Sequence, residues 1–273
     1  MKRFKNFGKV NSPVIELQIE SLPTTVTNNI IEPKNITILE PKRKIISFGY
    51  RCISGSFIID LGIKTESYPF DWMFSTLDII KHSIDTNFIE FLNVDNYVKS
   101  TSPNYCIIDN VKTLVSNEIT YYNKYYERDI DAELKYHHDI SCNHRNVVND
   151  LEYYERCVER LYNFLSSNID KSYIHFCPIM GINDLIKNKE SIIDKFDNFS
   201  NFITTKTTNI FGLFFVLVMN DSQTKSIKIK ETKNYDIYVI NCNKSFIEGG
   251  IPFWGEYSKE YSEIVNIITN HLT

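Results

Sequence analysis

The amino-acid sequence predicts an α/β fold: a single three-layer domain in which helices flank a mostly parallel central sheet. Short apolar runs without polar alternation are typical of strands buried on both faces, and the chain has four, at residues 45–49, 173–180, 211–219 and 235–241. Amphipathic helical patterns separate or follow these runs, as this fold class requires. Ligands of such sheets bind outside the carboxyl ends of the strands, so we expect functional residues in the loops that follow them.

The first strand is followed by a helix. Apolar residues recur at helical spacing from Ile53 to Leu61, and Gly62 closes this segment as a C-cap. Further helices are expected over residues 77–91, 148–165, 191–203 and 261–272, and β-type fragments over 105–108 and 112–115. Residues 1–43 contain four prolines and no sustained period, so we expect an irregular, extended N-terminal arm before one domain at residues 44–273.

Composition and charge exclude several classes of protein. The net charge is −4, with 30 basic and 34 acidic residues spread along the chain, which argues against a nucleic-acid partner. The longest apolar run, residues 211–219, is far shorter than the roughly 20 residues that cross a bilayer, and no apolar segment follows the basic residues 1–5. We therefore expect no membrane span and no secretory signal. Six cysteines without a Cys-x-x-Cys pair favour free thiols in a reducing compartment such as the cytoplasm.

Cys52 is the candidate nucleophile. It follows the first strand through a glycine turn and opens the first helix, where free N–H groups carry a partial positive charge that favours the thiolate. Backbone N–H groups of residues 51–53 are expected to hold an oxyanion there. The alternative is that Cys52 is a small buried packing residue, as unpaired cysteines often are.

A thiol nucleophile needs a base, and His138 in the cluster His137-His138-Asp139 is the candidate. Neighbouring residues of a strand point to opposite faces, which disfavours Asp139 as the acid that orients the ring. Asp71, or another acid such as Asp221, is then preferred. The alternative for Asp71 is a structural one, as the cap of a turn anchored by aromatic neighbours.

Two further groups have donor types that suit metals. His138, Cys142 and His144 could be zinc ligands, but their spacing matches no standard finger. Asp129-Ile130-Asp131 has the Asp-x-Asp form with which many sugar-nucleotide transferases hold a divalent ion, although a solvated acidic loop is the better explanation. We therefore predict no metal and no cofactor. Phosphate-loop, dinucleotide and Gly-x-Ser-x-Gly motifs are absent from the sequence.

The motifs around these residues resemble those of a known family of papain-like cysteine peptidases. Residues 47–52 are similar to its Ser-Leu-Gly-x-x-Cys motif, residues 68–72 contain its Pro-Phe-Asp-Trp motif, and His138-Asp139 resembles its His-Asp pair. The resemblance covers roughly residues 44–180. It implies Cys52 as nucleophile, His138 as base, and Asp71 or Asp139 as a third member.

The chain also departs from this family. His175-Phe176-Cys177 stands in a strand where the family tends to carry an arginine. The alternation of strands and helices also fits a doubly wound sheet better than a papain-like α+β layout, so the peptidase description can apply to a constellation of residues and not to the fold.

These observations predict a cysteine-dependent hydrolase or acyl transferase that acts on a peptide, acyl or glycan substrate. Two alternatives stay open. One is a glycan-related transferase that uses a sugar nucleotide, with Asp129 and Asp131 on a metal ion. The other is a non-catalytic binding or structural protein in which Cys52 and His138 are vestigial.

Overall fold

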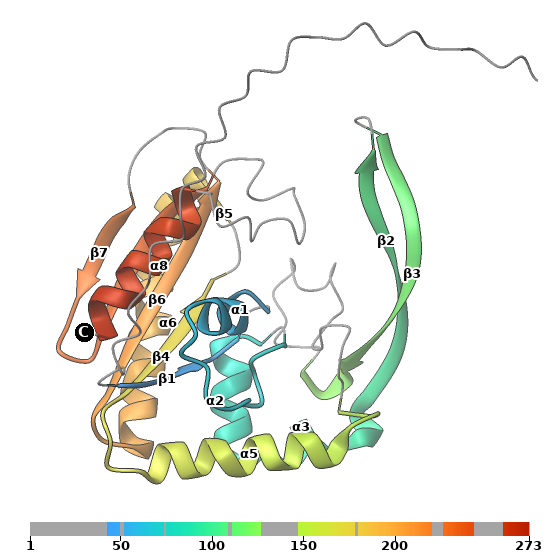
Figure 1. Ribbon diagram of the computed structural model, residues 1–273, viewed down its shortest axis with the longest axis horizontal. Helices are drawn as coiled ribbons and strands as arrows, with labels where there is room; N and C mark the ends of the chain where they lie inside the picture. Colours follow the sequence, from blue (N-terminus) through green and yellow to red (C-terminus); the bar gives the residue numbers. More distant parts are fainter. Residues whose placement is uncertain are drawn as a thin grey trace, which may run out of the picture. The chain divides into compact units, whose positions relative to one another are not determined.

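The computed structural model describes residues 43–49, 52–73, 75–108, 111–126, 147–177, 180–219, 226–242 and 259–272. Within these ranges the chain forms one mixed, mostly parallel sheet with helices on both faces, and a separate two-stranded ribbon (Figure 1). The predicted α/β fold is confirmed. The expected arm over residues 1–43 lies outside the described residues apart from Arg43, so it stays a prediction.

The sheet is built from parallel strands that lie side by side. Its order is β1-β4-β6-β8-β7, in which β7 is antiparallel to β8 and the short β5 pairs with the end of β6. The strands are β1 (Lys44–Ser47), β4 (Lys171–Phe176), β5 (Met180–Gly181), β6 (Ile210–Met219), β7 (Ile227–Glu231) and β8 (Tyr235–Cys242). Because β1, β4, β6 and β8 run in one direction, their carboxyl ends meet at one edge of the sheet.

Alternate residues of the strands point to opposite faces and build two apolar clusters. On one face, α1 (Cys52–Asp60) and α8 (Lys259–Leu272) pack against strand residues such as Ile45 and Ile240. On the other face, α2 (Leu77–Asp85), α5 (Leu151–Ser166) and α6 (Ile182–Lys206) share a larger cluster. The ring of Phe48 lies in this second cluster, against the rings of Tyr173 and Phe199. The sheet is therefore the middle of three layers.

The helix expected over residues 77–91 is broken. Helix α2 ends at Asp85, Asn87 and Phe88 adopt φ of 53° and 60°, and α3 (Ile89–Leu92) follows. A left-handed conformation is unfavourable for a bulky residue. The Phe88 ring is fully buried and packs against Phe70 and Phe91, and this burial offsets the backbone cost. Tertiary packing thus overrides the helical period.

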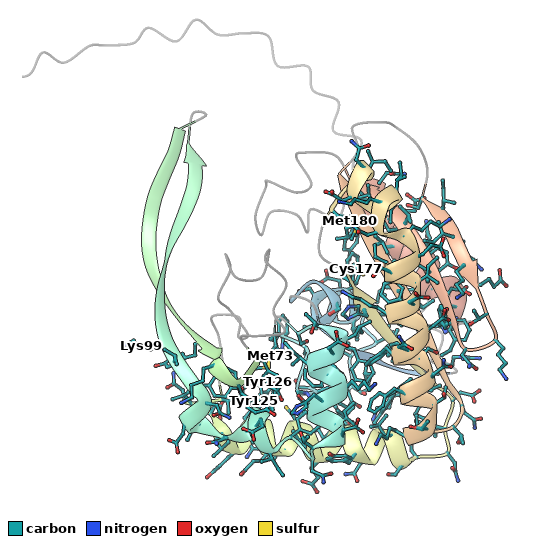
Figure 2. All side chains as sticks on the ribbon, turned by 180° about the vertical axis from the view of Figure 1, so that it is seen from behind. Met73, Lys99, Tyr125, Tyr126, Cys177 and Met180 are labelled. Carbon is teal, nitrogen blue, oxygen red and sulfur yellow. The ribbon has the colours of Figure 1, made fainter. Side chains whose placement is uncertain are left out.

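The β-type fragments expected at 105–108 and 112–115 belong to a much longer antiparallel ribbon. Its strands are β2 (Tyr97–Ile108) and β3 (Val111–Asn123), with η1 (Val94–Asn96) before it and η2 (Lys124–Tyr126) after it. Tyr97 Oη donates to the Phe91 carbonyl at 2.8 Å, and the Asn123 amide donates to the Glu90 carbonyl at 2.8 Å. Tyr126, at the foot of the ribbon in Figure 2, bonds with Ser83 Oγ at 3.1 Å. The ribbon is anchored to the helices at its base.

The antiparallel strand β7 was not predicted from the sequence, and the other differences concern boundaries. Helix α5 begins at Leu151, close to the predicted residue 148, whereas α6 begins at Ile182 and not at residue 191. None of the described helices is both long and apolar enough to pass through a membrane.

Candidate functional site

The candidate site is the turn that joins β1 to α1 at the carboxyl edge of the sheet. Strand β1 ends at Ser47, and Cys52 is the first residue of α1. Between them Gly49 has a φ of +67°, a conformation that glycine adopts without steric cost. The predicted sequence of strand, glycine turn and helix is present, and it puts Cys52 at a helix N-terminus.

Two buried serines hold this turn in place. The hydroxyl groups of Ser47 and Ser54 are joined by a short hydrogen bond. The Gly49 N–H donates to Ser47 Oγ at 3.3 Å, and Ser54 Oγ donates to the Gly49 carbonyl at 3.1 Å. These bonds tie the end of the strand, Gly49 and the first turn of α1 together.

The segment that carries the Pro-Phe-Asp-Trp motif packs directly on α1. A Cβ on Gly55 would lie 2.5 Å from the carbonyl oxygen of Asp71 and 3.3 Å from its carbonyl carbon. Only glycine therefore allows the helix to approach this backbone so closely. Gly55 lies about one helical turn after Cys52. The motif at residues 47–52 and the motif at residues 68–72 therefore belong to one structural unit, although they are separated in the sequence.

The Asp71 carboxylate is a buried member of an ion pair. Its Oδ2 accepts hydrogen bonds from Lys64 Nζ at 2.7 Å and from the Tyr68 N–H at 3.0 Å, and the side chain is 2% exposed. Burial raises the pKa of Asp71, while Lys64 and the Tyr68 N–H act in the opposite direction. Asp71 thus caps its own turn, one of the roles considered from the sequence. No histidine in the described ranges bonds to this carboxyl, so an orienting role stays a prediction.

His175 lies beside the turn, although in the sequence it marks only a departure from the family pattern. Its Nδ1 is 2.7 Å from the Phe48 carbonyl oxygen. Because a carbonyl only accepts, Nδ1 carries the proton and Nε2 keeps its lone pair. The side chain is 3% exposed, and burial lowers its pKa to about 4, so the ring is neutral at neutral pH. The sequence offered one indication of this role, a histidine near the carboxyl end of an otherwise apolar run. Cys177, which follows the same strand, is labelled in Figure 2.

The comparison with models of known protein families found a match. A family model described as "Putative papain-like cysteine peptidase (DUF1796)" matches residues 43–227. The chain belongs to this family. The matched range includes β1, the glycine turn, α1, the segment around Asp71 and β4, and it extends beyond the residues 44–180 over which the motifs suggest a resemblance. No curated protein and no solved structure was found to match the chain.

The structure describes some of the predicted site residues of this family member and not others. It places Asp71 and the backbone of Cys52 in one unit. His138 and Asp139 lie outside the described residues, and so do Asp129, Asp131, Cys142, His144 and Asp221. In the part of the chain that is described, no group of three or more His, Cys, Asp or Glu side chains could hold a metal ion.

Two other cysteines differ from Cys52 in their setting. Cys157 and Cys242 are fully buried within elements and not at a helix start. Burial raises the pKa of Cys157, and it raises the pKa of Cys242 to about 12. Neither thiol is therefore suited to act as a nucleophile at neutral pH.

Proposed function

We propose that this protein is a cysteine-dependent hydrolase or acyl transferase with Cys52 as its nucleophile. The observation that carries the proposal is the place of Cys52, at the first residue of α1 and just beyond the carboxyl end of a parallel strand. The first N–H groups of a helix have no partner within it, and their partial positive charge favours a thiolate. A reducing compartment such as the cytoplasm, which keeps the thiol unoxidised, fits this chemistry.

The proposed reaction is acyl transfer. The Cys52 thiolate adds to a carbonyl carbon, and the electron pair of the C=O π bond moves to the oxygen. Backbone N–H groups at the start of α1 stabilise this oxyanion. When the carbonyl reforms, the leaving group departs with a proton from the general acid, and the acyl group remains as a thioester. Water or another nucleophile then releases the product and restores the thiol.

His138 is the proposed base, which the His-Asp pattern of the family supports. Asp71 or Asp139 is the proposed third member. The contacts of Asp71 support an additional positioning role, because its backbone fits against Gly55 and its carboxylate is bound by Lys64. This segment therefore holds α1, and with it Cys52, at the edge of the sheet.

Acetylation by p-nitrophenyl acetate tests the proposal without knowledge of the natural substrate. We expect release of p-nitrophenolate with transfer of the acetyl group to Cys52, located by peptide mass spectrometry, and loss of both in Cys52→Ala. Cys157→Ala and Cys242→Ala remove buried thiols and serve as matched controls that keep the wild-type rate. Unchanged turnover in Cys52→Ala would rule the proposal out.

The pH dependence of Cys52 alkylation by iodoacetamide tests the proposed base. An activated thiol should show an inflection well below the ordinary pKa of about 8.5, and His138→Ala should move the inflection upward. Alkylation that is slow and indifferent to His138 would remove His138 from the proposal.

A further inference from the structure

The hydroxyl group of Ser75 is buried without a hydrogen bond. The residue is 1% exposed, and its Oγ has no hydrogen-bond partner among the residues that the structure describes. Buried hydroxyl groups are nearly always hydrogen-bonded, because an unmade bond leaves the desolvation of the group uncompensated. We therefore expect this hydroxyl group to form a hydrogen bond with a molecule that binds to the protein.

Ser75 Oγ lies directly against the β1–α1 turn. A Cβ on Gly49 would overlap Ser75 Oγ and would lie 3.3 Å from Ser75 Cβ. The hydroxyl group thus occupies the space that a side chain at residue 49 would fill. Gly49 is three residues before Cys52, so the unpaired hydroxyl belongs to the surroundings of the α1 N-terminus.

In the described part of the turn, residues 47–49, several acceptors are engaged by other groups. His175 Nδ1 donates to the Phe48 carbonyl, and Ser54 Oγ donates to the Gly49 carbonyl. Ser47 Oγ bonds with Ser54 and accepts from the Gly49 N–H. Three acceptors of residues 47–49 thus already hold hydrogen bonds, whereas Ser75 Oγ beside them holds none within the described ranges, and an acceptor brought by a ligand would satisfy it.

We propose that Ser75 is a substrate-binding residue whose O–H donates a hydrogen bond to the substrate's carbonyl oxygen as it becomes the oxyanion. The inference rests on the proposed function, with Cys52 as the nucleophile. The thiolate forms a bond to the carbonyl carbon, the π pair moves to oxygen, and Ser75 keeps its proton throughout. The bond to the leaving group breaks when the carbonyl reforms. The substrate class is a carbonyl compound with a leaving group: an ester, a thioester or an amide.

The test compares two reactions of the same thiol in Ser75→Ala. Acetylation of Cys52 by p-nitrophenyl acetate passes through an oxyanion, whereas alkylation by iodoacetamide is a displacement at saturated carbon and forms none. Loss of one oxyanion donor lowers such rates by about 100-fold or more. We expect a fall of this size in acetylation, whereas the rate of alkylation should stay close to that of wild type. The melting temperature should not fall, since no hydrogen bond is lost.

Ser83→Ala is the matched control. Ser83 is as buried as Ser75, but its Oγ donates to the Ile79 carbonyl at 2.7 Å and bonds with Tyr126 Oη at 3.1 Å. Its removal should lower the melting temperature and leave both rates of Cys52 unchanged.

The outcomes separate the inference from the function on which it rests. Wild-type acetylation in Ser75→Ala would overturn the inference alone. Equal losses of acetylation and alkylation, with a lower melting temperature, would indicate a structural serine and would also overturn it. A wild-type protein in which Cys52 is not acetylated would overturn the proposed function together with the inference.

Discussion

The buried ring of His175 should make the stability of the protein depend on pH. Its pKa is lowered from 6.5 to about 4, mainly by burial. Between these values the unfolded chain binds a proton that the folded chain does not, so the free energy of unfolding falls as the pH falls. The linkage relation gives a loss of about 2 kcal/mol between pH 7 and pH 5, and about 3 kcal/mol by pH 4.

Urea unfolding of wild type and His175→Asn at these pH values measures the effect. Asparagine offers an amide N–H near the position of Nδ1–H, so it retains a donor for the Phe48 carbonyl while removing the titration. We expect the variant to lose about 2 kcal/mol less than wild type between pH 7 and pH 5. The pKa of His271 is also lowered to about 4 by burial, so His271→Asn is a control that changes the pH dependence away from the turn. Parallel pH dependences in wild type and His175→Asn would refute the reasoning.

Two further changes test the unit formed by α1 and the Asp71 segment. Asp71→Asn leaves the Lys64 ammonium, whose side chain is 13% exposed, without its carboxylate and should cost about 3–5 kcal/mol of stability. Adding Lys64→Met should recover part of this loss in urea unfolding, and strictly additive effects would contradict the pairing. Gly55→Ala should cost about 1–3 kcal/mol despite the better helix propensity of alanine, because its Cβ meets backbone. In Gly181→Ala the new Cβ would lie 3.3 Å from a side-chain carboxylate that can move, so thermal unfolding should change little; equal stabilities of the two alanine variants would speak against the close approach.

Much of the fold follows from local patterns. The apolar runs of β1, β4, β6 and β8 indicated strands buried on both faces, and each is present near its predicted position. The spacing of apolar residues does not predict the structure where tertiary contacts outweigh local preferences. Phe88 leaves the helical conformation because its ring is buried in the core, and the polar residues of β2 and β3 conceal a long ribbon whose pairing comes from backbone hydrogen bonds.

The sequence by itself determined that Cys52 follows a glycine turn and opens a helix, since strand, turn and helix are local structures. Tertiary structure alone decided that Asp71 pairs with Lys64, that His175 bonds to the Phe48 carbonyl, and that Ser75 lies unpaired against the turn. Each of these depends on which segments of the chain the sheet and helices bring together. The types of residue and their spacing along the chain do not show which hydrogen-bond donors and acceptors will lie within reach of one another.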